Sequence, residues 1–193
     1  MVIALIVIVV LVVLIGLWVV TSYNGLIKLR NLVQEAWRQI DVELNRRHDL
    51  IPNLVETVKG YASHERETLE AVTRARAAAV APGAGPAEQA AQENVLSQAL
   101  GRLLAISEAY PDLKANQNFL ALQNELSQTE DRIANGRRYY NATVRELNTK
   151  VETIPSNIIA GLFNVSRAEY FEADDPAVRA APTISFGNNP PGS

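Results

Sequence analysis

The sequence predicts an all-α protein in which one N-terminal transmembrane helix precedes an up-and-down bundle of long helices. Two observations lead to this prediction. Residues 2–20 are Val, Ile or Leu at sixteen of nineteen positions and carry no charge. In segments 24–76, 88–109 and 119–151, apolar residues recur at steps of three and four, the period of an amphipathic helix. About 170 residues follow the span, enough for one domain with its own core.

The predicted anchor covers residues 1–23 and is marked by Val2, Leu11, Gly16, Trp18, Val20 and Tyr23. At 1.5 Å per residue, a helix over residues 2–20 is roughly 30 Å long, which matches the hydrocarbon thickness of a bilayer. A cleaved signal peptide is the alternative, but that needs a basic residue before a shorter apolar run. Trp18 and Tyr23 are instead typical of a membrane interface. We therefore expect a permanent anchor in the lipid bilayer.

The flanking charges predict the orientation of this anchor. Lys28, Arg30 and Arg38 follow it, whereas no basic side chain precedes it. The positive-inside rule then places the N-terminus outside and the bundle in the cytoplasm. The lack of cysteine excludes a disulfide framework. A net charge of −3 without a basic stripe argues against nucleic acid as a partner.

The first cytoplasmic segment, residues 24–76, carries an apolar stripe that keeps its helical phase throughout. Its members are Leu26, Val33, Ile40, Leu54 and Tyr61 at one heptad position and Trp37, Leu44, Ile51, Val58 and Val72 at another. Pro52 lies inside the segment, lacks an N–H group and clashes with the carbonyl of residue 48. Because the stripe keeps its phase across Pro52, we expect a kink and three long helices plus a short one. The alternative is a new helix from Asp49, which gives four.

Three further segments complete the predicted bundle. Residues 77–87, rich in Ala, Pro and Gly, predict a flexible linker. A second helix over 88–109 should face inward with Val95, Leu96, Leu100, Leu103 and Leu104. Asn116 or Asn118 should cap the third, whose seam is Phe119, Leu122, Leu126, Thr129, Ile133, Gly136, Tyr140, Val144, Leu147 and Val151. Gly136 on this seam predicts a close approach of two helices.

A short apolar helix is expected at residues 157–163, after Pro155. Its candidate contact residues are Ile158, Ile159, Leu162 and Phe163. They fit either a lid that closes one end of the bundle or a contact with the bilayer surface or a neighbouring subunit. The bundle domain should span residues 24–171, and residues 172–193 should form a tail without fixed structure.

Charged residues on the apolar seams are the other candidates for a specific role. Arg47 falls on the seam of the first helix, so it must snorkel outward or pair with an acid such as Glu125 or Glu130. Such a pair would either set the helix register within one chain or bridge two subunits. The same two alternatives apply to Glu65, Arg137 and Arg138. The full set of packing or assembly candidates is Trp37, Arg47, Pro52, Glu65, Glu125, Glu130, Gly136, Arg137, Arg138 and Tyr140.

The sequence offers no catalytic, cofactor-binding or metal-binding motif. His48 and His64 are not preceded by Glu at the spacing of a di-iron site, and zinc ligation is not expected from two His residues without cysteine. The glycines at 83 and 85 lack the Lys and the strand of a phosphate-binding loop.

The longest motifs resemble those of the LemA family. The similarity rests on residues 36–44 (AWRQIDVEL), 46–47, 49–62 (DLIPNLVETVKGYA) and 64–65, and on the later pieces 121–126, 129–130, 138–141 and 155–160. Ala142, Ile154 and residues 164–165 depart from the family pattern, which would have an acidic residue, Phe and Gly-Phe there. The resemblance implies a bacterial inner-membrane protein with one N-terminal span, a cytoplasmic up-and-down bundle and no established enzymatic activity. It also implies kinship with a protein that builds the magnetosome, and a membrane metalloprotease as a frequent genomic neighbour.

Two functional hypotheses follow. The first is a non-enzymatic scaffold that forms a homo-oligomer and organises or shapes the cytoplasmic face of the inner membrane, because parallel anchoring raises the effective concentration of neighbouring copies. The alternative is a monomeric adaptor or substrate-docking module for a membrane protease or another membrane partner.

Overall fold

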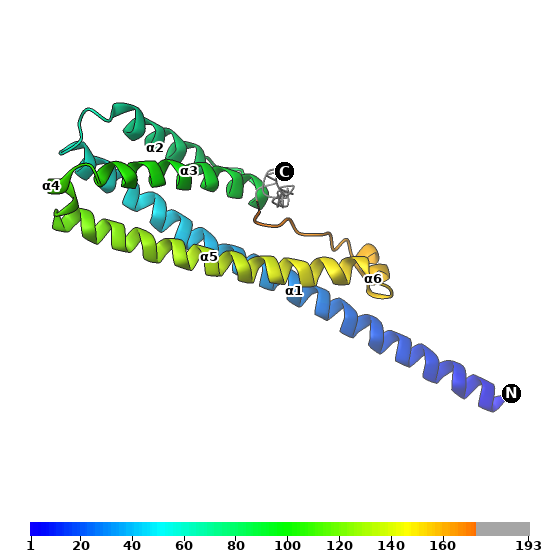
Figure 1. Cartoon of the computed structure of the whole chain (residues 1–193). Coiled ribbons are helices and arrows are strands. Elements are labelled where there is room, and N and C mark those ends of the chain that lie inside the picture. Colours follow the sequence, from blue (N-terminus) through cyan, green and yellow to red (C-terminus); the bar gives the residue numbers. More distant parts are fainter. Residues whose placement is uncertain (173–193) are drawn as a thin grey trace, which may run out of the picture.

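The computed structural model describes residues 1–172, and Figure 1 shows their arrangement. The described chain is helical, as expected. Its helices are α1 (Val2–Lys59), α2 (Arg66–Ala79), α3 (Pro86–Ser107), α4 (Pro111–Lys114), α5 (Gln117–Glu152) and α6 (Ser156–Leu162). The predicted tail from residue 173 onward lies outside the described residues.

Helix α1 runs without interruption from the apolar segment into the bundle. Its residues 2–25 hold no buried side chain, and from Leu26 to Val58 one side of the helix is buried. Pro52 lies within α1 on an exposed position. The alternative in which Asp49 begins a new helix is therefore wrong.

The chain reverses eight residues after Pro52, at residues 60–65, which the apolar stripe did not reveal. Gly60 ends α1, and the amides of Tyr61 and Ala62 both donate to the carbonyl of Val58, at 3.0 and 2.8 Å. Ala62 is fully buried in this turn while Tyr61 is 43% exposed. The prediction of one helix to residue 76 is therefore wrong. The stripe kept its phase because Val72, which continues it in the sequence, lies on the separate helix α2 and is buried there.

Four long helices thus form the part of the bundle that is distal to the N-terminus. Helices α2 and α3 form a hairpin that lies along α1 and α5 (Figure 1). Residues 77–79 of the expected linker belong to α2, and Pro86 opens α3. Val95 is 58% exposed, so its predicted inward position is wrong, whereas Leu96, Leu100 and Leu103 are buried. Helix α3 buries a different face because Glu93, Leu96 and Leu100 share one side of it.

Helix α5 is the long partner of α1. The side chain of Asn116 caps it by accepting a hydrogen bond from the amide of Phe119 at 3.0 Å. The two helices approach closely at Gly136, where a Cβ would lie 3.0 Å from Cγ1 of Ile40. A side chain at position 136 would crowd Ile40 across this contact.

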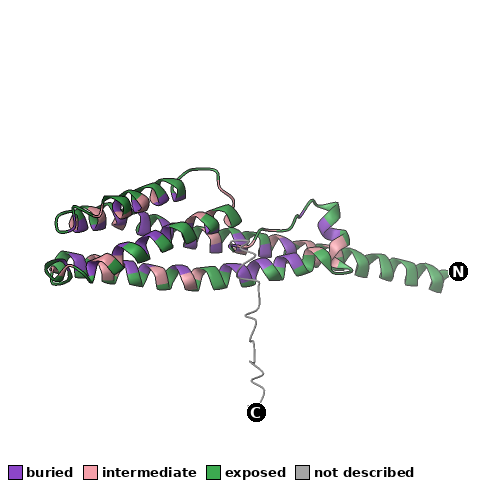
Figure 2. Ribbon diagram, turned by 45° about the horizontal axis from the view of Figure 1, so that its top comes forward, coloured by how far each residue is buried: buried purple, intermediate pink, exposed green. Residues whose placement is uncertain are grey.

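Near the anchor the bundle changes its construction. Helix α6 folds back on the C-terminal end of α5, and an extended strap, residues 164–172, returns along α1 and α5 toward the start of α3 (Figure 1). Figure 2 shows that buried positions are interleaved along the bundle, while the N-terminal part of α1 is exposed and projects beyond it. This projecting segment is long and apolar enough to cross a membrane.

We expect Gly136→Leu to destabilise the bundle by about 1–3 kcal/mol, because the added side chain overpacks the α1–α5 seam. Gly101→Leu is the matched control, since Gly101 is exposed on α3 and a Cβ there meets nothing within 4 Å. The control should be neutral or stabilise by up to about 1 kcal/mol through helix propensity. Chemical unfolding of both variants, followed by circular dichroism, measures the difference. Equal effects at the two positions would contradict the close approach.

Candidate functional site

A layer of polar side chains divides the core of the bundle into two apolar clusters. The cluster near the anchor ends at Leu44 of α1 and Ile133 of α5, and the distal cluster begins at Ile51 and Leu126. The residues between them on the same helix faces are Arg47, His48, Glu93, Thr129 and Glu130. This polar layer is the most unusual feature of the core, since buried charges are rare unless they are paired.

Arg47 occupies the centre of the layer and is only 1% exposed. Its guanidinium forms ion pairs with Glu93 of α3 and Glu130 of α5. It also donates to Oγ of Ser97 at 3.0 Å and to the carbonyl of Glu93 at 3.2 Å. One side chain of α1 therefore makes directional contacts with both α3 and α5.

The carboxylate of Glu93 also binds two neighbouring polar side chains. It accepts hydrogen bonds from Nε2 of His48 at 2.7 Å and from Nε2 of Gln89 at 2.8 Å. Burial by itself would raise the pKa of Glu93, but the hydrogen bond from His48 and the charge of Arg47 outweigh it and hold the pKa below its usual value. Glu93 is therefore a carboxylate at neutral pH.

Pro52 ties α2 to the same layer. Because Pro52 has no N–H group, the carbonyl of His48 loses its helical partner. Nε of Arg76 on α2 donates to this carbonyl at 2.7 Å. The proline thus creates an acceptor on α1 that α2 fills, so all four long helices meet at residues 47–48.

The strap is held by a second set of polar groups, on α5. Oδ1 of Asn148 accepts from the amide of Ala168 at 2.8 Å, and Oδ1 of Asn141 accepts from the amide of Phe171 at 2.9 Å. The hydroxyl of Tyr140 donates to the carbonyl of Glu169 at 2.8 Å. Burial, with the charge of Glu169, raises the pKa of Tyr140 to about 12, so this hydroxyl keeps its proton.

Trp37 anchors the end of the strap from the side of α1. Its ring lies 5.5 Å from the ring of Tyr140 and 5.5 Å from that of Phe171, in tilted and edge-on arrangements. Trp37 and Tyr140 therefore hold the strap against α1 and α5.

The other charged candidates lie at or near the surface, outside the polar layer. Glu125 pairs with Arg46 at 2.7 Å, and both are more than 40% exposed. Glu65 accepts from the hydroxyl of Tyr110 at 3.3 Å. Arg137 and Arg138 are exposed on α5. They do not join the polar layer.

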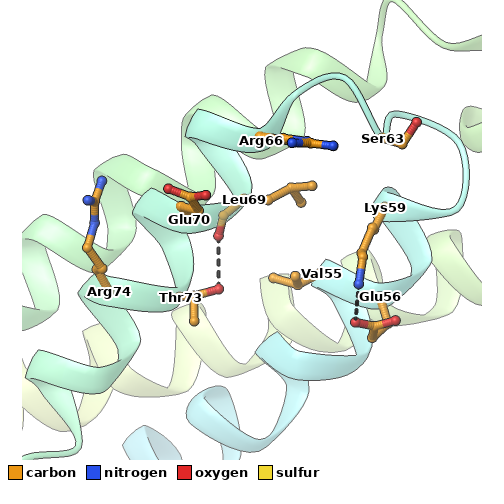
Figure 3. A pocket seen from close by; sticks show the side chains of 9 residues that line it. All are labelled: Val55, Glu56, Lys59, Ser63, Arg66, Leu69, Glu70, Thr73 and Arg74. Atoms are coloured by element: carbon orange, nitrogen blue, oxygen red, sulfur yellow. Dashed lines mark hydrogen bonds and ion pairs between the residues drawn. The ribbon is translucent and has the colours of Figure 1, made fainter.

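A groove of about 530 Å³ opens at the end of the bundle farthest from the anchor, between α1 and α2 (Figure 3). Val55 and Leu69 form its apolar floor, and the charged side chains of Lys59, Arg66 and Glu70 surround it. Among the residues that the structure describes, no group of three His, Cys, Asp or Glu side chains is placed to hold a metal ion.

Comparison with known proteins agrees with the resemblance of the sequence motifs to a known family. The model of the LemA family matches residues 36–186. The chain belongs to the LemA family. Its relatives include magnetosome protein MamQ 2 of Paramagnetospirillum magneticum, 28% identical over 78% of this chain and 64% of the relative, and protein LemA of Metamycoplasma hominis, 27% identical over 79% of this chain and 69% of the relative. The chain thus spans slightly less than two thirds of the length of its MamQ relatives.

Membership of the LemA family, together with the apolar projecting segment of α1, indicates a membrane-associated protein. The relatives' names describe no enzymatic activity. Sequence reasoning found Arg47 and one of its partners, Glu130, but missed Glu93, His48, Arg76 and the asparagines of α5 that bind the strap. Asn141 and Asn148 were visible as two polar residues seven apart beside an otherwise apolar seam.

We expect Arg47→Met to lower the free energy of unfolding by about 3–5 kcal/mol, because it leaves the carboxylate of Glu93 buried without its main counter-charge. Arg46→Met is the matched control, since the neighbouring Arg46 pairs with Glu125 at the surface and should change stability little. Denaturant titration of the full-length variants tests this. A small loss of stability in both variants would show that the buried carboxylate of Glu93 does not need Arg47 as its counter-charge.

Acid should weaken the polar layer. The pKa of Glu93 is lower in the folded protein than in the unfolded chain. The charged form therefore stabilises the fold above the pKa that Glu93 has in the unfolded chain, and this contribution disappears as the pH falls through the folded pKa. Stability should fall less steeply on acidification in Glu93→Gln than in the wild type. The exposed Glu88→Gln should retain the steep profile, and parallel profiles for all three proteins would exclude the assigned role.

Proposed function

We propose that this member of the LemA family is a non-enzymatic scaffold, anchored by α1 in the bacterial inner membrane, that self-assembles side by side and organises or shapes the cytoplasmic face. The continuity of α1 carries this proposal. Its apolar segment and its bundle segment form one helix of 58 residues, which at 1.5 Å per residue is roughly 87 Å long. A rod fixed in this way stands in the same orientation in every copy.

The orientation proposed for the rod rests on its flanking charges. Lys28 and Arg30 are exposed just beyond the apolar segment, and basic residues at the end of a span favour the cytoplasmic side. Copies that cross the bilayer in the same direction are confined to one membrane plane. This confinement raises their effective concentration, so weak lateral contacts suffice for assembly.

The lateral faces of the bundle offer such contacts. Val42 on α1 is 64% exposed and Tyr139 on α5 is 48% exposed, and the exposed Arg137 lies close to Tyr139 in sequence. Aromatic and Arg side chains are enriched in protein interfaces. The name of the MamQ relatives, magnetosome proteins, is in keeping with work at a membrane.

The groove of Figure 3 favours the second candidate, a monomeric adaptor that docks a membrane protease or another membrane partner. An adaptor needs a concave recognition surface and no lateral self-contact, so the two candidates differ in the behaviour of neighbouring copies.

Cysteine crosslinking in native membranes tests the proposal, because the chain has no cysteine of its own. Single cysteines are placed at the exposed positions of residues 34–46 on α1 and 131–143 on α5 and oxidised at native expression level. A scaffold should give crosslinked dimers at positions three or four residues apart, since one helix face makes the contact. Weak, even crosslinking along both helices, as random collision gives, would contradict self-assembly.

A further inference from the structure

We propose that the outer face of α6 is a membrane-contact surface that lies in the headgroup boundary of the bilayer crossed by α1. We call this face the apolar cap; it consists of Ile154, Ile158, Leu162 and Phe163. These side chains are 83%, 57%, 69% and 48% exposed. Such exposure is unusual for four large apolar side chains in one place and marks an interaction surface.

The pattern of the segment suits a lipid surface. Ile158 and Leu162 are four residues apart within α6, so the helix presents them on one side, and Ile154 is exposed in the turn before it. No charged residue occurs from residue 153 to residue 166. Insertion of this segment would therefore not require a buried charge.

The opposite side of α6 fixes the apolar cap in place. Ile159 and Ala160 are each 2% exposed and belong to the core near the anchor. The helix thus closes the end of the bundle with one face and leaves the other free. Both readings expected from the sequence, a lid and a bilayer contact, apply to opposite faces of the same helix.

The position of α6 along α1 places the cap at the level of the interface. The rings of Phe163 and Tyr23 lie 4.5 Å apart. Tyr23 follows Val20, the last residue of the apolar span, by three residues, or about 4.5 Å along the helix. Interfacial helices insert about 5–10 Å into the boundary between headgroups and acyl chains. The apolar cap is therefore continuous with the membrane-spanning surface.

The charges around the cap agree with this placement. Lys28 and Arg30 on α1 and Lys150 on α5 are exposed at the same end of the bundle. Arg167 just beyond the cap pairs with Glu152 at 2.8 Å. Basic side chains at this level meet the negative headgroups of the cytoplasmic leaflet. Two attachments, the span and the cap, then fix the tilt of the bundle on the membrane.

The test uses full-length protein, one copy per nanodisc, in phosphatidylcholine with phosphatidylglycerol. A fluorophore is attached to Ile158→Cys or Leu162→Cys and quenched by lipids that carry a nitroxide near the headgroup. We expect quenching several-fold stronger than at Val42→Cys, an exposed position far from the anchor. Iodide in the water should give the reverse order.

Two controls separate the possible failures. Leu11→Cys must be quenched by a nitroxide deep in the acyl chains; if it is not, the anchor is wrong. If Leu11→Cys is quenched but positions 158 and 162 behave like position 42, the bilayer contact is overturned. Protection from iodide that appears only with two copies per nanodisc would assign the cap to a second copy instead. This inference rests on the membrane span and not on self-assembly. The membrane contact can therefore be overturned without overturning the proposed scaffold, and the reverse also holds.

A charge placed in the cap provides a second variant. With the fluorophore on Ile158→Cys, Leu162→Glu should reduce quenching by the headgroup nitroxide to the level at position 42. Val95→Glu, also at an exposed apolar position, should leave it unchanged. The inner face of α6 is untouched in both variants, so loss of folding does not explain the result. Quenching that survives Leu162→Glu would contradict the assignment.

Discussion

The buried guanidinium of Arg47 is the constraint on which the arrangement of the helices depends. A charge that is 1% exposed is tolerated only if its partners are in place, and those partners come from α3 and α5. The next residue, His48, offers its side chain to Glu93 and its carbonyl to Arg76 of α2. A shift of any long helix by one turn would leave at least one of these groups unpaired. The polar layer thus sets one register for the whole bundle.

This layer also marks where the rod changes its construction. On the distal side, four helices surround an apolar core; on the side of the anchor, α1 and α5 continue and the strap and α6 take the place of the hairpin. Asn141 and Asn148 supply the hydrogen bonds that the extended strap lacks from a sheet or helix. The half of the bundle nearer the apolar N-terminal segment is therefore completed by residues that follow the long helices in the sequence.

The sequence predicted the structural features that depend on residues close together in the chain. The apolar run, the N-cap at Asn116 and the periodic seam of α5 were all visible, because each pattern lies within one segment of the sequence. The turn at residues 60–65 was missed, since Val72 on α2 continued the phase of α1 by coincidence. Glu93, Arg76 and the strap could not be found from the sequence, because each gains its role from a residue at least twenty positions away. Charge on an apolar seam, as at Arg47, was the one local signal of the polar layer.

The most direct test of the scaffold is the mass and shape of the full-length protein extracted in mild detergent, by mass photometry with electron micrographs of the same particles. Side-by-side association of continuous rods predicts symmetric assemblies of several copies that persist on dilution, with bundles parallel to one another. A monodisperse monomer at every dilution would contradict self-assembly and favour the adaptor.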